Sequence, residues 1–226
     1  MPDNVPEIVL SGGPCSGKST SLASLSAKLV EWGYRPLVVP ELATTLMAGG
    51  LHDLGAIAGR DPEHFLEIEM RILLMMRAVR LQYLALAETF TKRGEKVVII
   101  YDRAEPDIAP YVGPEAFAQM CEQAGLSTHD VRDSYHAVIY LVTSAFGAEH
   151  DYTTANNTTR RETVEEARAV DMRTRAAWQG HPNLLIVDAS TEFQAKIDGV
   201  LAATAKALGI AGHSDAERAP VPDPAP

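Results

Sequence analysis

The chain has 226 residues, of which 46% are hydrophobic and 22% charged, a balance typical of one soluble globular domain. Its net charge of −10 disfavours binding to nucleic acid or to an anionic membrane surface. The two cysteines, Cys15 and Cys121, lie far apart, which excludes a disulfide framework or a structural zinc site. The start lacks a basic segment, and no apolar run approaches the ~20 residues of a membrane span. We therefore expect no signal peptide, no span and a cytoplasmic location.

Short, nearly continuous apolar runs alternate with helical patterns along the chain, which predicts a parallel β-sheet covered by helices. We expect strands over Glu7–Leu10, Pro36–Val39, Lys96–Tyr101, Ala137–Val142 and Asn183–Val187. Helices are expected near Lys18–Trp32, Glu41–Met47, Pro62–Arg93, Pro114–Glu122, Arg160–Trp178 and Thr191–Leu208. Residues 1–209 are thus predicted to form one α/β domain, and the Pro-rich residues 210–226 a flexible tail.

The longest predicted helix, Pro62–Arg93, begins with an N-cap, Asp61, and a proline at its first position. Its apolar residues recur at steps of three and four, which predicts a buried stripe made up of Phe65, Ile68, Ile72, Met75, Val79, Tyr83, Leu86 and Phe90. At 1.5 Å per residue the helix would be ~45 Å long. It could cover the sheet alone or supply a two-fold interface in a homodimer.

The most specific motif is Gly12–Thr20, which matches G-x-x-x-x-G-K-[ST] between a predicted strand and a predicted helix. Its backbone N–H groups and the helix N-terminus are expected to face nucleotide phosphates. Lys18 would bridge the β- and γ-phosphates, and Ser19 would ligate Mg²⁺. Lys18 is predicted to lie in a solvent-facing loop, so that its removal leaves the fold intact. The expected nucleotide-binding residues here are Gly12, Gly13, Pro14, Cys15, Ser16, Gly17, Lys18, Ser19 and Thr20.

Phosphate binding alone does not separate a motor, a switch and a kinase. The chain has no guanine-binding [NT]-K-x-D motif, and no D-x-x-G motif follows its third predicted strand. It is also too short to house the second helical domain of an AAA+ machine comfortably. These observations favour a small kinase-like domain that uses ATP, with GTP as the second choice of nucleotide.

Charged residues follow two of the predicted strands. Asp102 and Arg103 follow Lys96–Tyr101, and Glu41 follows Pro36–Val39 after one proline. Ligands bind at the carboxyl edge of open α/β sheets, so Asp102 is expected to hold Mg²⁺ and Arg103 an acceptor or a phosphate. Glu41 would take the proton of an acceptor hydroxyl. The alternatives are a structural Asp-Arg pair and a glutamate placed by the helix dipole.

Arg160 and Arg161 follow the polar run Asp151–Thr159 and precede a helix rich in charges. We expect these arginines to clamp the transferring phosphoryl group. They would belong to a lid over residues 150–178 that closes to exclude water. The later charges of this helix, Asp171 among them, are interpreted as a solvated face paired at i, i+3 or i, i+4. That interpretation is also the alternative for the two arginines.

In this order the motifs resemble those of P-loop kinases of the deoxynucleoside-kinase and thymidylate-kinase type. More closely, they resemble the small ATPase/kinase family that includes the ribosylnicotinamide-kinase domain and the TRPL-translocation-defect-like proteins. The resemblance runs from about Glu7 to Leu208 and includes Val39-Pro40-Glu41, Tyr101-Asp102-Arg103, Asn156-Asn157, Arg160-x-Glu162 and Asp188-x-Ser190-Thr191. It implies a three-layer P-loop NTPase fold with a five-stranded parallel sheet, a helical lid, and a nucleotide-binding loop at Ser190 and Thr191.

The chain departs from the resembling proteins after the Asp-Arg pair, where they often have glycine and it continues Ala104-Glu105-Pro106-Asp107. The identity of the acceptor is therefore not carried over. Asp107 is expected either to bind a polar acceptor or to cap a helix. The leading hypothesis is an ATP/Mg²⁺-dependent phosphotransferase acting on a hydroxyl of a small, nucleoside-like acceptor. The alternative is a nucleotide-dependent regulatory switch that acts through a protein partner.

Overall fold

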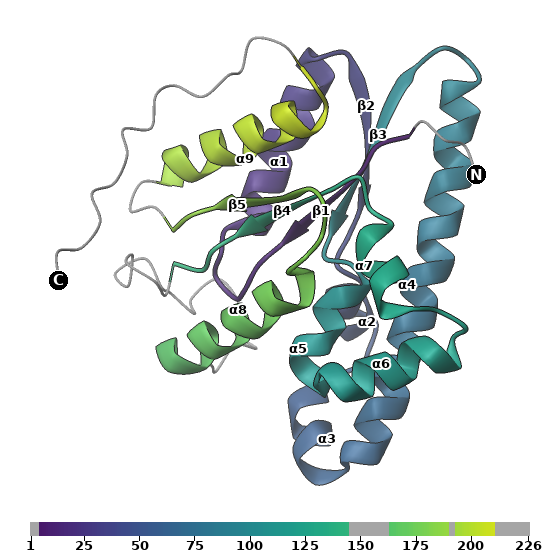
Figure 1. The fold of residues 1–226 in the computed structure, drawn as a ribbon, viewed down its shortest axis with the longest axis vertical. Coiled ribbons are helices and arrows are strands. Elements are labelled where there is room, and N and C mark those ends of the chain that lie inside the picture. Colours follow the sequence, from purple (N-terminus) through teal and green to yellow (C-terminus); the bar gives the residue numbers. More distant parts are fainter. Residues whose placement is uncertain (1–4, 145–162, 190–192, 211–226) are drawn as a thin grey trace, which may run out of the picture.

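A computed structural model describes residues 5–144, 163–189 and 193–210. Its five strands form one all-parallel sheet in the order β2-β3-β1-β4-β5 (Figure 1). They are β1 (Glu7–Ser11), β2 (Tyr34–Val39), β3 (Lys96–Asp102), β4 (Ala137–Leu141) and β5 (Leu184–Val187). The predicted strands are confirmed, with the largest difference at Tyr34 and Arg35, which extend β2. The order places β1, and the loop that follows it, in the middle of the sheet.

Six helices correspond to the predicted ones: α1 (Lys18–Glu31), α2 (Leu42–Ala48), α4 (Pro62–Thr91), α6 (Pro114–Gln123), α8 (Val164–Trp178) and α9 (Phe193–Ala207). The N-cap of α4 is confirmed, because the Asp61 side chain accepts a hydrogen bond from the backbone N–H of His64. Four short elements were not predicted: α3 (Leu54–Arg60), η1 (Glu105–Ile108), α5 (Ala109–Val112) and α7 (Thr128–Asp133). None of the helices within the described ranges is long and apolar enough to cross a membrane.

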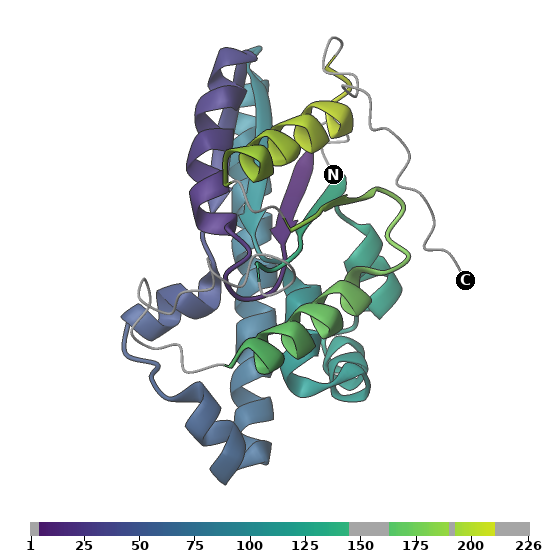
Figure 2. The same ribbon diagram turned by 90° about the vertical axis from the view of Figure 1, so that its left-hand side faces the viewer.

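The sheet separates two buried layers, because successive side chains of a strand point to opposite faces. Ile8 and Leu10 of β1 pack with residues of α1 and α9 on one face. Val9, between them, packs with residues of α4 and α8 on the other face. Figures 1 and 2 show these helices on either side of the strands. The three-layer fold with a five-stranded parallel sheet is therefore confirmed.

The long helix α4 differs from its predicted pattern in which residues it buries. Met75 and Leu86 are 43% and 44% exposed, so their assignment to the core was wrong. The buried side carries Arg80 instead, which donates hydrogen bonds to both carboxylate oxygens of Glu7 on β1, each at 2.8 Å. Its guanidinium also lies 4.2 Å from the centre of the Tyr135 ring. The inner face of α4 thus includes a charged residue, Arg80, which the apolar periodicity of the helix does not predict.

Candidate functional site

The loop between β1 and α1 is shaped by glycines, as its motif requires. Gly12 has φ 145°, and a Cβ atom there would lie 2.1 Å from the carbonyl oxygen of Leu141. Gly17, in the left-handed region with φ 85°, precedes the first residue of α1. Side chains at these positions would clash or strain the backbone. The sharp curl of the loop therefore depends on glycine at both ends.

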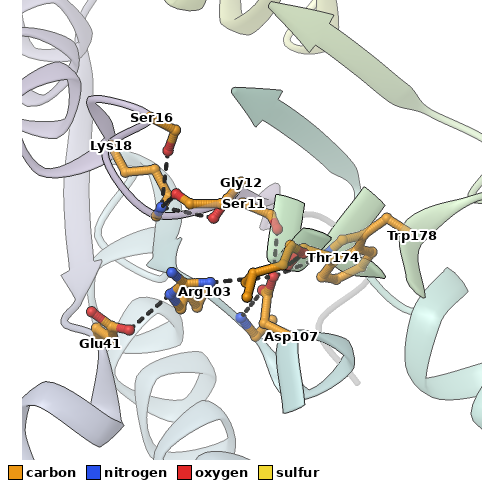
Figure 3. Close-up of polar contacts among 12 residues, drawn as sticks. Ser11, Gly12, Ser16, Lys18, Glu41, Arg103, Asp107, Thr174 and Trp178 are labelled. Carbon is orange, nitrogen blue, oxygen red and sulfur yellow. Dashed lines mark hydrogen bonds and ion pairs between the residues drawn. The ribbon is translucent and has the colours of Figure 1, made fainter. Parts of the chain in front are cut away.

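Lys18 folds back over this loop. Its ammonium donates hydrogen bonds to the carbonyl oxygens of Gly12 at 2.8 Å and Gly13 at 2.9 Å, and to Ser16 Oγ at 3.0 Å (Figure 3). Only 7% of the residue is exposed, so the prediction of a solvent-facing lysine was wrong: the loop carbonyls hold the ammonium inside. Burial, followed by repulsion from Arg103, lowers the pKa of Lys18 to about 7. The loop thus contains a buried amine that a nearby anion would keep charged.

Two residues that follow β4 donate hydrogen bonds to the loop between β1 and α1. Thr143 Oγ1 donates to the carbonyl oxygen of Pro14, and Ser144 Oγ donates to that of Cys15 at 2.9 Å. Ser19 is exposed in the first turn of α1, as is Thr20. The predicted Mg²⁺ ligand among them, Ser19, is thus accessible to solvent.

Helix α8 reaches the loop through Asp171. Asp171 Oδ1 accepts hydrogen bonds from the backbone N–H of Gly13 at 3.0 Å and from that of Thr143 at 3.1 Å. The Tyr140 hydroxyl donates to the backbone carbonyl of Asp171 at 2.6 Å. Only 3% of Asp171 is exposed, so its interpretation as part of a solvated face was wrong. A Cβ atom on Gly13 would lie 2.6 Å from Asp171 Oδ1, which explains why glycine stands there.

Asp102 ends β3 and is buried. Within the described residues its Oδ1 atom has no hydrogen-bond partner. Burial raises the pKa of Asp102, while the Lys18 ammonium acts in the opposite direction. A buried carboxylate oxygen without a donor is costly, and a hydrated cation beside it would remove that cost. Its chemistry therefore fits the Mg²⁺ ion expected at this strand end.

Glu41 and Arg103, predicted separately, form an ion pair. Arg103 Nε lies 2.7 Å from Glu41 Oε1, and Thr44 Oγ1 donates to Glu41 Oε2 at 2.8 Å. The Arg103 backbone lies in the left-handed region, with φ 70°, and its side chain is only 9% exposed. Glu41 occupies the N-cap position of α2. The carboxyl ends of β2 and β3 thus bring these two side chains together (Figure 3).

Asp107 caps η1, one of the two roles that the sequence left open. Its Oδ2 atom accepts from the backbone N–H of Ala104 at 2.9 Å. Its Oδ1 atom accepts from Ser11 Oγ and from Trp178 Nε1, the latter at 3.3 Å. Acceptor binding by Asp107 stays a prediction, and both carboxylate oxygens already have donors.

A cavity of about 240 Å³ opens beside the Glu41–Arg103 pair. Its wall is mainly apolar and aromatic, and consists of Val39, Pro40, Leu42, Thr45, Met76, Val79, Tyr83, Tyr101, Arg103, Ala104, Glu105 and Tyr135. The sequence marks Glu105 as an extra acid after the Asp-Arg pair, without giving it a role, and the structure places it in this wall. The Tyr135 hydroxyl donates to Glu105 Oε2, and Oε1 has no hydrogen-bond partner within the described residues. The cavity therefore combines an apolar body with a carboxylate oxygen in its wall.

Four predicted site residues lie outside the described residues. Arg160 and Arg161 fall in the gap before α8, and Ser190 and Thr191 fall in the gap before α9. The first part of the expected lid falls in the same gap as the arginines. Their roles stay predictions.

The loop rich in glycine joins the central strand β1 to helix α1 and carries Lys18. Asp102 ends β3, which lies beside β1 in the sheet. This combination defines a P-loop NTPase domain. The sequence matches the family described as "AAA domain" over residues 7–196, and the chain belongs to this family. The matched residues run from β1 into α9. No curated protein matches the chain significantly. Nucleotide binding follows from the P-loop domain, whereas the finer resemblance to ribosylnicotinamide-kinase-type proteins stays a prediction.

Proposed function

We propose that the protein is an ATP/Mg²⁺-dependent phosphotransferase that moves the γ-phosphate to a hydroxyl of a small acceptor. The observation that carries this proposal is the position of the cavity. It lies beside the Glu41–Arg103 ion pair, at the same sheet edge as the P-loop. A hydrolase needs room only for water, whereas 240 Å³ accommodates a small organic molecule. A strand-end carboxylate that pairs with a residue lining such a cavity is suited to accept a hydroxyl proton.

On the nucleotide side, the P-loop would hold the phosphates and the Lys18 ammonium would turn from the loop carbonyls toward them. Ser19 and Asp102 would hold Mg²⁺, which offsets the negative charge of the phosphates when it is bound. The Asp102 carboxylate oxygen, which has no hydrogen-bond partner among residues 5–144, 163–189 and 193–210, supports this assignment. Positioning and charge stabilisation are the main contributions of protein residues to phosphoryl transfer.

On the acceptor side, Glu41 would take the proton of the hydroxyl as its oxygen bonds to the γ-phosphorus. The bond between that phosphorus and the β–γ bridging oxygen breaks, ADP leaves, and Glu41 releases the proton to solvent. Arg103, 2.7 Å from Glu41, would orient this carboxylate. The apolar wall around Met76 and Tyr83 would contact the body of the acceptor. A donor group of the acceptor would reach Glu105.

The remaining predicted residues complete the proposal. Arg160 and Arg161 would stabilise the charge on the transferring oxygens, on a lid that excludes water. Ser190 and Thr191 would contact the nucleotide from the other side. ATP is the proposed nucleotide, since the sequence has no guanine-binding motif.

The test is a panel of nucleosides, sugars and other small alcohols with ATP and Mg²⁺, read as ADP release above the background in water. We expect one class of acceptor to stimulate release. Glu41→Gln should then lower the stimulated rate by about 10²-fold or more, the usual contribution of a general base, while ATP binding stays within about twofold. Glu31→Gln, at the exposed end of α1, is the matched control. ADP release that no acceptor stimulates would contradict the kinase and favour a regulatory NTPase.

A further inference from the structure

The outer face of α4 is apolar and exposed. Leu74, Met75, Leu81 and Leu86 are 37%, 43%, 52% and 44% exposed. Figure 1 shows α4 along one edge of the described part of the chain. Scattered exposed apolar residues are normal, whereas exposed apolar residues that recur on one side of a helix indicate an interaction surface.

Two of these residues, Leu74 and Leu81, belong to a regular seam, whereas Met75 and Leu86 lie outside it. From Glu67 onward, exposed or half-buried residues follow one another at alternating steps of four and three, the spacing of a coiled-coil seam. The eight positions are Glu67, Arg71, Leu74, Ala78, Leu81, Ala85, Glu88 and Lys92. The four central residues are apolar and the two at each end are charged. From the first to the last, the seam is ~38 Å long at 1.5 Å per residue.

The seam is complementary to itself when reversed. We propose that α4 pairs with α4 of a second copy of this chain, antiparallel, about a two-fold axis that passes between residues 79 and 80. This register sets Leu74 opposite Ala85 of the second copy and Ala78 opposite Leu81 of the second copy. Each large side chain then faces a small one, so the two ridges can interdigitate without a void. A two-fold axis repeats each contact.

The charges at the ends fit the same register. It sets Glu67 opposite Lys92 of the second copy, and Arg71 opposite Glu88 of the second copy. Both pairs have opposite signs, and the axis makes four such contacts. Glu88 and Lys92 already form an ion pair within the helix, with Lys92 Nζ 2.7 Å from Glu88 Oε1. The second copy would extend this pair into a network at each end of the seam.

Other arrangements of the two helices lose this match. A parallel pair would set Glu67 against Glu67 and Arg71 against Arg71. Antiparallel registers shifted by one heptad would set Arg71 opposite Leu81, or Leu74 opposite Lys92. Unfavourable alternatives of this kind make a pairing specific. A second copy is therefore the occupant that the seam fits, in one orientation and one register.

The seam and the candidate site lie on opposite sides of α4. Met76, Val79 and Tyr83 line the cavity, and in a helix they project away from the seam residues. Pairing through the seam would therefore leave the cavity open. The oligomeric state and the phosphotransferase activity can be tested separately.

The experiment measures the mass of the full chain by sedimentation equilibrium over a range of concentrations. The wild type should behave as a dimer. Arg71→Glu and Glu88→Arg should each raise the dissociation constant by about tenfold or more, because each turns two attractive contacts into repulsive ones. The double variant R71E/E88R restores opposite signs across the axis and should regain most of the affinity. Arg60→Glu, an exposed charge reversal on α3, should change nothing.

Recovery of dimer affinity in the double variant would distinguish a loss of the proposed contacts from a general loss of stability in the single variants. Circular dichroism should show all variants equally folded. A wild type that stays monomeric at every concentration overturns the proposal, including the case in which the seam binds another protein. A double variant no tighter than its parents overturns the register. Leu81→Asp should abolish the dimer, and a dimer that survives it would also contradict the seam.

Discussion

The carboxylates on the two sides of the P-loop differ in their hydrogen-bond partners. Toward α8, Asp171 and Asp107 accept hydrogen bonds from donors fixed in the fold, among them backbone N–H groups and the Trp178 ring. Toward α2, Asp102 has an oxygen without a donor among the described residues, and Glu41 forms an ion pair with Arg103, which lines a cavity. All four residues are acidic: Asp102 ends β3, Glu41 precedes α2, Asp107 lies in η1, and Asp171 of α8 contacts the P-loop. The open oxygen of Asp102 and the cavity beside the Glu41–Arg103 pair, and not the charge alone, distinguish the candidate site from the framework.

The largest effect is expected at the point where the two sides meet. Lys18→Met keeps the length of the apolar stem and removes the ammonium. Turnover should fall on the order of 10³-fold, the scale for loss of a charged group that stabilises a transition state. The free energy of unfolding should change by less than about 1 kcal/mol, since three hydrogen bonds are lost but a buried cation is removed as well. Turnover at the wild-type level would mean that the loop lysine does not contact the reacting phosphate.

The framework side is tested by Asp171→Ala. This change leaves the N–H groups of Gly13 and Thr143 buried without an acceptor, so the free energy of unfolding should fall by about 2–3 kcal/mol. Urea unfolding measures it. Asp171→Asn is the matched variant, because one amide oxygen can accept both bonds, as Oδ1 does in the structure. Equal losses in the two variants would show that charge, and not hydrogen bonding, matters at this position.

The smallest effect concerns the pH dependence of nucleotide binding. With a pKa of about 7, Lys18 in the free protein loses its proton as the pH rises, whereas a bound triphosphate favours the charged form. ATP affinity should therefore decrease between pH 7.5 and 9, by less than tenfold per pH unit. Calorimetric titration in buffers of matched ionic strength measures this. The profile of Lys18→Met should be flat over the same range. A rising or flat wild-type profile would place the lysine elsewhere in the complex.

The fold was largely predictable because its strands are continuous apolar runs and its P-loop is a specific motif. Glu41, Asp102 and Arg103 were found by one rule, that strand ends meet at one edge. Asp171 was missed because α8 carries many charges at helical spacing. Ala167, Asp171, Thr174 and Trp178 nevertheless recur at steps of four, three and four, and all are buried. That spacing is the signal that could have placed Asp171 on the inner face.

Other features could not follow from local pattern. Glu7 and Arg80 lie 73 positions apart, and no spacing rule joins a strand to a helix over such a distance. Apolar residues surround much of α4, so periodicity could not tell the core face from the exposed one that carries Met75 and Leu86. The sequence marked Glu105 as a departure after the Asp-Arg pair, but only the fold placed its carboxylate in the wall of a cavity.

The close approach of α8 to Gly13 has a consequence for the history of the chain. The general motif tolerates any residue at this position, yet here a side chain would collide with an aspartate 158 residues further along. The sequence of this P-loop therefore depends on helix α8 and cannot be exchanged independently of it. A graft of this loop from another P-loop domain would succeed only with a smaller residue in place of Asp171 or with glycine retained. Over evolution the two positions are expected to change together or not at all.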